Sequence, residues 1–369
     1  MHRTDLTADW ALAQPLIRAS SLPAELYTDP AVQRVESERI FARSWQLFAH
    51  ASQLVDGGDH VVGNVAGVPL IAVRGDDGIL RAFHNVCRHR AGPLATCDGR
   101  GAKALRCRYH GWTYTLAGQL RSAPEMAEAE DFDATTIALP PVRIETWQGM
   151  AFVALDDVPP LTDVVSGIDA RMTGHLLADY RFHHRTQYEI ACNWKVYVDN
   201  YLEGYHVPHI HPALNRMLDY RGYVTETAAW YSLQSSPMEA SDAANASNFY
   251  GDGEALYYFI YPNTMLNILP GRLQTNRVIP LAPDRCRVEF DFFYPAGDDP
   301  AERLRRERDD AFSDEVQQED VHICVEVQRG LASGSYRPGR LCPRRESGVH
   351  HFQELIRQAW RNAPVRAPA

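Results

Sequence analysis

The chain has 369 residues, 45% of them hydrophobic and 10% aromatic, which is enough for one large domain or two ordinary ones with a substantial core. Its formal net charge of −10 argues against nucleic acid as the main partner. No signal-peptide pattern and no apolar run near the roughly 18 residues of a membrane span occur, so we expect no membrane association. Seven cysteines, an odd number, are a poor disulfide framework and fit a reducing cytoplasm.

Residues 1–44 are predicted to be a helical segment and residues 45–157 a small all-β domain. A helix is expected over 29–44, where Asp29 and Pro30 make a start signal. Short apolar runs then alternate with glycine and aspartate turns, which is typical of β-structure. The expected strands include 61–62, 70–73, 80–83 and 150–154, with a hairpin turn at 76–78.

The remaining residues, 158–369, are predicted to be a larger α+β domain built on an antiparallel sheet with helices. It is expected to begin near Pro159 and Pro160, because consecutive prolines stop regular structure. We expect helices over 162–178, 193–206, 300–331 and 348–361, and strands over 255–261, 273–280 and 285–294. The predicted fold class is therefore α+β.

Two short motifs, separated by 17 residues, each supply one cysteine and one histidine. They are Cys87-Arg88-His89 and Cys107-Arg108-Tyr109-His110. A two-iron cluster can take two cysteines on one iron and two histidines on the other, and the neutral imidazoles raise its reduction potential. The same four residues suit tetrahedral zinc, so a zinc-stabilised binding protein is an alternative, as are two unrelated Cys/His pairs in a core.

A later motif places acids and histidines close together in the chain. Asp199, Glu203 and His206 follow one another at steps of four and three, so a helix would align them as one polar stripe. His206 and His211 are five residues apart, and Pro208 is expected to break the helix so that His211 turns back. Two histidines and a distant carboxylate can hold non-haem iron with positions open for O₂ and substrate. Helix-capping or buried, hydrogen-bonded histidines are the alternative.

The distant carboxylate is expected on the helix over 300–331. Asp320 lies one helical turn from both Val316 and Cys324, and a carboxylate on an apolar helix face requires a metal or a charge partner. Its neighbour Glu319 points about 100° away by helix geometry. Asp320 is therefore the predicted third ligand.

The two Cys/His motifs, with Gly111-Trp112 after the second, resemble the Rieske motif of ring-hydroxylating and related oxygenases. The resemblance implies a [2Fe–2S] cluster with Cys87 and Cys107 on one iron and His89 and His110 on the other. Respiratory Rieske proteins carry an extra cysteine in each half, where this chain has Pro93 and Tyr109. Cys97 has no role in the pattern and is expected to be a structural or surface thiol.

The later motif and the Glu319-Asp320 pair are also similar to Rieske oxygenases, and the similarity runs from about residue 27 to about residue 355. It implies mononuclear Fe(II) held by His206, His211 and Asp320. In that family the acid before the first histidine usually links the cluster of one subunit to the iron of the next in a homotrimer. This acid is usually aspartate, but Glu203 stands here, as in the glycine betaine and carnitine branch. Glu203 and Asp199 are the expected catalytic residues.

The resemblance also implies a separate flavin/iron–sulfur reductase that draws electrons from NAD(P)H. Neither a G-x-G-x-x-G fingerprint nor plant-type ferredoxin cysteine spacing occurs in this chain, so we expect those functions on another protein. The chain would then be the terminal oxygenase. A Rieske electron carrier without catalysis is a weaker alternative, because it leaves the second histidine pair unexplained.

Three further stretches resemble the choline, glycine betaine and carnitine oxygenases: 199–208, 259–263, and 327–331 with 339–340. A quaternary ammonium ligand requires an aromatic cage, for which the candidates are Trp230, Tyr231, Tyr258, Phe259 and Tyr261. Ordinary core packing is the alternative for each ring. An aromatic substrate would stack on the same residues, so an aromatic-ring hydroxylating dioxygenase is the alternative to monooxygenation (N-demethylation or hydroxylation) of a small quaternary ammonium substrate.

Overall fold

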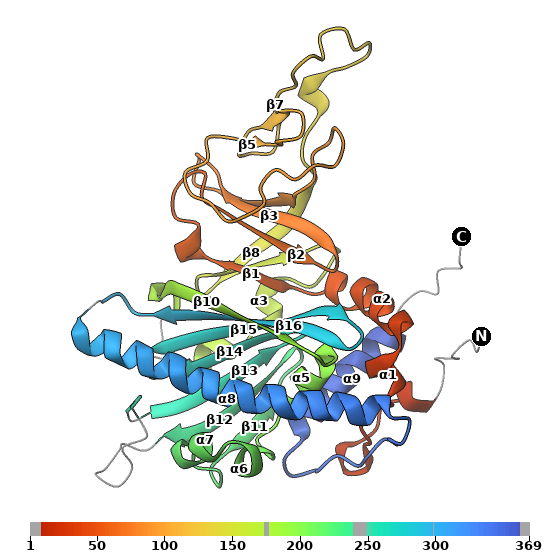
Figure 1. Ribbon diagram of the computed structural model, residues 1–369, viewed down its shortest axis with the longest axis vertical. Helices are drawn as coiled ribbons and strands as arrows, with labels where there is room; N and C mark the ends of the chain where they lie inside the picture. The colour runs from red at the N-terminus through yellow and green to blue at the C-terminus, as the bar shows by residue number, and fades with distance from the viewer. Residues whose placement is uncertain (1–8, 173–176, 239–248, 252, 298, 362–369) are drawn as a thin grey trace. The chain divides into compact units, whose positions relative to one another are not determined.

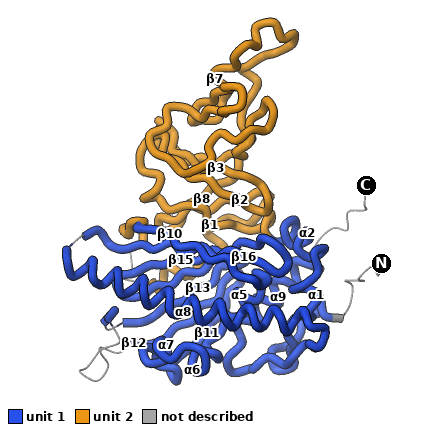
Figure 2. The backbone as a smooth tube through the Cα atoms, in the orientation of Figure 1, with its two compact units in different colours: residues 1–40, 183–369 blue, residues 41–182 orange. Residues whose placement is uncertain are grey.

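The computed structural model describes residues 9–172, 177–238, 249–251, 253–297 and 299–361. The chain divides into two compact units, of which unit 1 comprises residues 1–40 and 183–369 and unit 2 comprises residues 41–182 (Figure 2). Unit 2 is built mainly from strands, and unit 1 combines a large sheet with helices (Figure 1). The predicted α+β fold class is confirmed.

Unit 2 contains a six-stranded sheet in the order β1-β9-β8-β4-β3-β2 and a three-stranded sheet in the order β5-β6-β7. The strands are β1 (Gln46–His50), β2 (His60–Val65), β3 (Val68–Arg74), β4 (Leu80–His84), β5 (Leu105–Arg106), β6 (Thr113–Tyr114), β7 (Leu120–Ser122), β8 (Pro141–Trp147) and β9 (Met150–Ala154). The short helices are η3 (Phe41–Arg43), η4 (Ala51–Gln53), η5 (Ala134–Thr136), α3 (Leu161–Val164), α4 (Ile168–Arg171) and η6 (Leu177–Asp179).

Strand β3 separates two hydrophobic cores of unit 2, because successive side chains of a strand point to opposite faces. Leu70 and Ala72 belong to one core, while Ile71 and Val73 belong to the other. The second core also contains Cys87 and Cys107, so the sheet packs directly against the two Cys/His motifs. The hairpin turn predicted at 76–78 joins β3 to β4 and is confirmed.

Unit 1 contains a seven-stranded sheet in the order β10-β16-β15-β14-β13-β12-β11. Its strands are β10 (Arg181–Ile190), β11 (Val224–Thr227), β12 (Tyr231–Met238), β13 (Gly253–Ile260), β14 (Thr264–Leu269), β15 (Arg272–Ala282) and β16 (Arg285–Tyr294). Its helices are η1 (Asp9–Ala11), η2 (Leu16–Arg18), α1 (Glu25–Thr28), α2 (Pro30–Arg39), α5 (Trp194–Tyr201), α6 (Val207–Ile210), α7 (Pro212–Met217), α8 (Pro300–Ala332) and α9 (Ser347–Arg361). The long helix α8 runs across the sheet in Figure 1 and contacts α5.

The helix predicted over 193–206 is shorter than expected. The prediction that Asp199, Glu203 and His206 lie on one face of a single helix is therefore wrong. Helix α5 ends at Tyr201, so Asp199 lies on it while Glu203 and His206 do not. The chain leaves the helix because the Glu203 carboxylate accepts from the backbone N–H of His206 (3.1 Å), which competes with helical hydrogen bonding. Pro208 then sits in the first turn of α6 and begins that helix, since its missing N–H is no loss there.

The division into units differs from the expected domain boundaries at 44/45 and 157/158. Residues 158–182 stay with unit 2 because their short helices pack on β8: the Leu161 N–H donates to Glu145 (3.0 Å), and the Trp147 indole donates to Asp169 (3.0 Å). The helix expected over 162–178 is broken into α3, α4 and η6, and part of it (173–176) lies outside the described residues.

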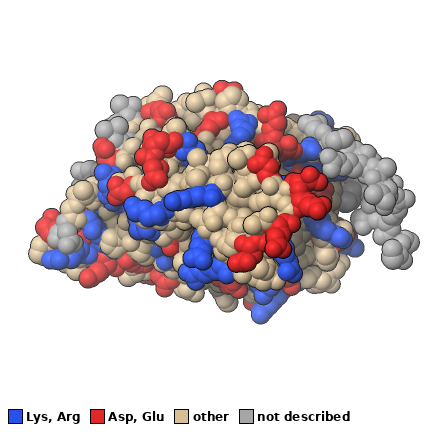
Figure 3. All heavy atoms as spheres, turned by 90° about the horizontal axis from the view of Figure 1, so that it is seen from above, with Lys and Arg blue, Asp and Glu red and all other residues tan. Residues whose placement is uncertain are grey.

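Charged side chains of both signs are interspersed on the face shown in Figure 3. In the part of the chain that the structure describes, no helix combines the length and apolar character needed to cross a bilayer.

Candidate metal centres and active site

Two loops of unit 2 repeat the same backbone hydrogen bonds. In each, the N–H of the cysteine (Cys87 or Cys107) donates to the carbonyl five residues later, at 2.9 Å. Its carbonyl accepts from the N–H four residues later, at 3.0 Å. The donors of these second bonds, Ala91 and Gly111, both have positive φ, 56° and 77°. The two motifs are therefore one loop structure used twice.

These loops bring the four predicted cluster ligands together. The rings of His89 and His110 are 4.6 Å apart, and the thiols of Cys87 and Cys107 are buried. A Cβ on Gly92 would lie 2.8 Å from the Cys107 sulfur, so glycine permits the close approach of the loops. The Nδ1 atom of His89 is buried and has no hydrogen-bond partner among the described residues, as expected of a nitrogen that binds metal. The site fits a cluster.

The phenol of Tyr114 lies against one of the cysteines. Its oxygen accepts from the N–H of Arg88 (3.0 Å), which leaves its own hydrogen for the Cys87 sulfur at 3.3 Å. Beside it, the indole of Trp112 stacks on His89 with centroids 4.9 Å apart and 8° between the planes. A hydrogen bond to a cluster sulfur tunes the reduction potential of an iron–sulfur centre.

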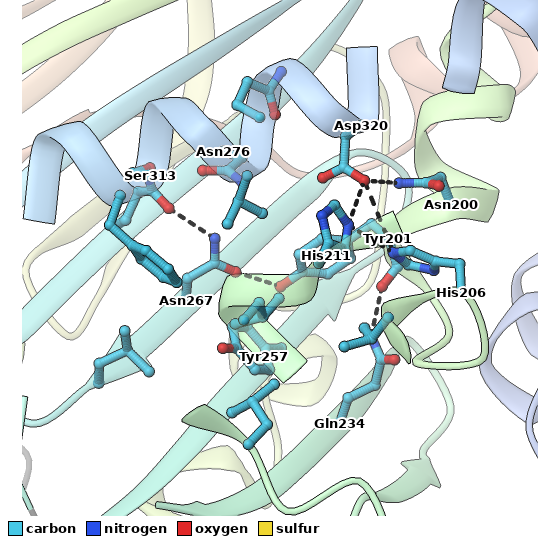
Figure 4. A pocket seen from close by; sticks show the side chains of 18 of the residues that line it. Asn200, Tyr201, His206, His211, Gln234, Tyr257, Asn267, Asn276, Ser313 and Asp320 are labelled. Atoms are coloured by element: carbon cyan, nitrogen blue, oxygen red, sulfur yellow. Dashed lines mark hydrogen bonds and ion pairs between the residues drawn. The ribbon is translucent and has the colours of Figure 1, made fainter. Parts of the chain in front are cut away.

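The predicted mononuclear ligands converge in unit 1, where their side chains point toward one another (Figure 4). His206 precedes α6, His211 lies between α6 and α7, and Asp320 projects from α8. The Nε2 atom of His211 is 3.1 Å from Nε2 of His206 and 3.0 Å from Oδ1 of Asp320. The turns between short helices thus bring His206 and His211 together, which one regular helix would not do.

A carboxylate lies at the outer nitrogen of each histidine. His206 Nδ1 is 2.7 Å from Glu203 Oε1, and His211 Nδ1 is 2.7 Å from Glu319 Oε2. Such a partner holds the proton on Nδ1 and leaves a lone pair on Nε2. Two Nε2 lone pairs and the Asp320 carboxylate would repel one another at these distances, so the donor set is suited to a divalent cation.

Glu319 was not predicted as part of the site, although it adjoins Asp320 in the sequence. Its direction, about 100° from Asp320, lets it contact Nδ1 of His211 while Asp320 contacts Nε2 of the same ring. Asn200, also not predicted, donates to Asp320 Oδ1 (2.6 Å). Glu319 could have been found from its place next to Asp320 in the sequence, whereas Asn200 has no such signal.

A cavity opens beside these ligands, with about 780 Å³ of empty space, part of it open to solvent. Its sheet side includes a cross-strand row, in which Gln234, Tyr257, Asn267 and Gln274 pair in register across β12, β13, β14 and β15. Its helix side is one face of α8, at positions 312, 313, 316, 317 and 320.

The five aromatic residues predicted as substrate contacts do not line this cavity. Phe259 and Tyr261 pack against Phe352 of α9, with ring centroids 5.5 and 6.5 Å apart. Tyr231 packs on Tyr258 (5.9 Å), and Trp230 on Tyr261 (6.3 Å). The rings that do line it are Tyr197, Tyr201, Tyr223, Tyr257, Phe290 and Phe312. Alternation along β13 explains part of the difference, since Tyr257 and Tyr258 point to opposite faces.

Asp199 is half-buried on α5 and does not line the cavity. Its carboxylate accepts from the hydroxyl of Tyr27 (2.7 Å) and the amide of Gln353 (3.1 Å). Burial nevertheless raises its pKa to about 6. It lines instead a second hollow in unit 1, which shares Asn200, Glu203 and His206 with the cavity. Those three residues form the wall between the two.

Comparison with known proteins agrees with both sites. Residues 177–361 match the family "Ring hydroxylating alpha subunit (catalytic domain)", and residues 44–141 match the "Rieske [2Fe-2S] domain" family. Chloroplastic choline monooxygenase of Arabidopsis thaliana is 35% identical over 356 residues, which are 93% of this chain and 83% of that protein. The carnitine monooxygenase oxygenase subunit of Escherichia coli K12 is 30% identical over 365 residues, 93% and 95% of the two chains.

Solved structures give the same result. The quaternary ammonium Rieske monooxygenase CntA, in complex with L-carnitine, superposes with a TM-score of 0.83 at 27% identity, over 94% of this chain and 99% of that one. Naphthalene 1,2-dioxygenase from Rhodococcus shares the fold, with a TM-score of 0.75 at 20% identity, over 98% and 97% of the two chains.

The fold and the two donor sets thus define the class, and the chain belongs to the Rieske oxygenases, as a ring-hydroxylating-type alpha subunit. It is an oxidoreductase that incorporates oxygen, with a [2Fe–2S] cluster and a mononuclear iron. The predicted family and cofactors are confirmed. The alternatives of a zinc-stabilised binding protein and of a non-catalytic electron carrier are excluded.

Proposed function

We propose that this oxygenase acts on a small quaternary ammonium compound, with His206, His211 and Asp320 as the iron ligands. The observation that carries the proposal is the cavity beside these residues, walled by tyrosine and phenylalanine rings. Ring faces attract a cation that cannot donate hydrogen bonds. Burial raises the pKa of Tyr257 to about 12. The curated relatives, which are choline and carnitine monooxygenases, support the same substrate class.

Ring hydroxylation of an aromatic substrate is the second candidate, because the fold also occurs in naphthalene 1,2-dioxygenase. The polar lining argues against it. Asn276 Oδ1 and Gln317 Nε2 lie in the cavity wall without a hydrogen-bond partner among the described residues, and a hydrocarbon ring would supply none.

The residues around the metal have separate tasks in this proposal. Glu203 and Glu319 hold the protons on the outer nitrogens of the histidines, and Asn200 orients the Asp320 carboxylate. When bound, the cluster supplies single electrons, and Fe(II) with two imidazoles and one carboxylate keeps positions open for O₂ and substrate. Overall, two electrons from NAD(P)H, two protons and O₂ yield oxygenated substrate and water. The electrons come through a separate flavin/iron–sulfur reductase.

We further propose a homotrimer in which the cluster of one copy serves the iron of another. Arginines Arg88, Arg90, Arg106 and Arg108 are exposed in and near the cluster loops of unit 2. The second hollow of unit 1 is lined by Asp199, Glu203 and Glu346. Opposite charges on two surfaces favour their association, which brings Glu203 to the contact between copies.

Mixed trimers test this arrangement. A Cys107→Ala copy without a cluster and an Asp320→Ala copy without iron are each expected to be inactive. If electrons pass between copies, co-assembly of the two should restore part of the activity. Activity that stays absent in verified mixed trimers would contradict the proposal.

We propose a cytoplasmic location because of the state of the cysteines. All seven are described and are free, as a reducing compartment would keep them.

Substrate oxidation by the holoenzyme with an electron-transfer reductase tests the substrate class. We expect O₂ uptake coupled to formaldehyde release or to a hydroxylated product with quaternary ammonium compounds, and none with benzoate or naphthalene. Asp320→Ala is the matched control, because it should abolish uptake while the cluster remains. Coupled turnover of the aromatic compounds alone would refute the proposed substrate class.

A further inference from the structure

Two buried side chains of the cavity wall each have a polar atom without a partner. Gln317 on α8 and Asn276 on β15 both line the cavity and are 2% exposed. The Nε2 atom of Gln317 and the Oδ1 atom of Asn276 have no hydrogen-bond partner among the described residues. Buried polar groups are nearly always paired, so an unpaired donor and acceptor in one cavity mark a place where a ligand supplies the partners.

A hydrogen bond from Tyr197 sets the orientation of the Gln317 amide. The hydroxyl of Tyr197, which is fully buried, donates to Gln317 Oε1 at 2.7 Å. The amide nitrogen is therefore the end that remains available as a donor.

Four other polar side chains of the wall are already paired with one another. Tyr201 donates to Asn267 (2.6 Å), Asn267 donates to Gln274 (2.9 Å), and Gln274 donates to Ser313 (2.8 Å). This chain of hydrogen bonds needs no ligand, so among the uncharged side chains of the wall Gln317 and Asn276 are the two with an unpaired atom.

The charge of the wall determines which polar group fits. Arg272 is the only arginine or lysine among the described residues that line the cavity. Its Nε makes no hydrogen bond to a described residue but lies 3.1 Å from the buried carboxylate of Asp309, with which it forms an ion pair. Asp309 also accepts from the hydroxyls of Tyr250 and Tyr294. Because the ion pair is neutral as a whole, the wall offers no unpaired side-chain cation to a carboxylate.

We propose that Asn276 and Gln317 form a subsite for a hydroxyl group, and that the substrate is a quaternary ammonium alcohol and not a quaternary ammonium carboxylate. A hydroxyl accepts from Gln317 Nε2 and donates to Asn276 Oδ1, whereas a carboxylate only accepts. The inference rests on the proposed quaternary ammonium substrate and narrows it.

Equilibrium binding to the oxygen-free holoenzyme tests the subsite with three probes. Choline carries the hydroxyl, ethyltrimethylammonium lacks it, and glycine betaine replaces it with a carboxylate. Asn276→Leu removes the acceptor, and Gln317→Glu keeps the acceptor for Tyr197 but removes the donor. Thr264→Val is the control, because Thr264 is 1% exposed with an unpartnered hydroxyl in the same sheet but does not line the cavity.

The ratio of dissociation constants for ethyltrimethylammonium and choline is the readout, since it cancels general damage to the site. We expect choline to bind about tenfold tighter in the wild type, as two hydrogen bonds to neutral groups allow. The ratio should fall toward one in Asn276→Leu and Gln317→Glu and stay unchanged in Thr264→Val.

A wild-type ratio near one, a ratio that neither variant changes, or tighter binding of glycine betaine than of choline would overturn the subsite. Tighter glycine betaine binding would leave the proposed substrate class intact. Failure of all three probes to bind or to be oxidised would remove the quaternary ammonium proposal itself.

Discussion

The Oε2 atom of Glu319 lies 2.7 Å from Nδ1 of His211, and this contact joins the long helix α8 to the turn that carries the histidine. Helix α8 thereby contributes twice to the proposed metal centre, through Asp320 as a proposed ligand and through Glu319 at the other nitrogen of His211. A partner of this kind fixes the histidine tautomer and raises its basicity as a ligand.

Glu319→Leu is expected to weaken ferrous iron binding about 10- to 100-fold, because His211 loses the partner that orients it. The measurement is the dissociation constant of Fe(II) in protein that retains its cluster. Glu315→Leu, an exposed acid on the same helix, should bind iron as the wild type does. Equal affinity in the two variants would show that the contact has no influence on the metal.

Asp320→Ala should lower the iron content from about three to about two per chain, because the cluster keeps its two irons and the mononuclear site loses its carboxylate. Metal analysis with the electron paramagnetic resonance signal of the reduced cluster checks both centres. Loss of the cluster signal, or activity that survives, would mean that Asp320 is not the ligand.

Tyr114→Phe removes the hydrogen bond to the Cys87 sulfur, which favours the more negative, reduced cluster. The reduction potential should fall by roughly 40 mV, the equivalent of about 1 kcal/mol for one electron. A redox titration measures it. The control is Tyr109→Phe, which removes the hydroxyl of an exposed tyrosine in the Cys107 loop. The assignment fails if both variants titrate at the wild-type potential.

Glu36→Leu should lower the free energy of unfolding by about 3–5 kcal/mol, because it leaves Lys195 charged and unpaired in the core. The two side chains are 2.7 Å apart and 1% exposed or less. Urea unfolding compares this variant with the double variant Glu36→Leu, Lys195→Met, which should recover most of the loss. A double variant as unstable as the single one would contradict this account.

Stability should fall as pH rises from about 4 to about 6, in part because of Asp199. Burial raises its pKa from 3.8 to about 6, so the folded protein binds this proton more tightly than the unfolded chain. The contribution is complete below the unfolded pKa and is lost as pH rises through the folded one, about 3 kcal/mol in all. Urea midpoints across this range should slope less in Asp199→Asn, and parallel profiles would argue against the shift.

Local sequence patterns predict the bounds of a helix well where the start signal lies within the helix itself. The helix over 300–331 was found nearly to the residue because Asp299 caps it and Pro300 begins it. The helix over 193–206 was overextended because the Glu203 side chain binds backbone N–H groups after Tyr201, a contact that periodicity does not reveal. Asp199 and Glu203, expected on one stripe, consequently lie in different local structures.

The aromatic cage shows the limit of sequence patterns most clearly. Tyr258 and Phe259 were chosen for residue type, but the register of β13 turns Tyr257 to the cavity and leaves its neighbours for packing. The unpaired atoms of Asn276 and Gln317 carry no sequence signal at all. They are recognised only in the folded structure, because the evidence is the lack of a hydrogen-bond partner among the described residues.

By itself, the sequence predicted the two donor sets, since cysteine, histidine and aspartate are ligands that iron takes in these combinations. It also determined the α+β class through its hydrophobic periodicities. Only the tertiary structure decided that Glu319 supports His211 and which rings and amides face the cavity. Those outcomes depend on strand register and on contacts between residues as far apart as 211 and 319, which no local pattern encodes.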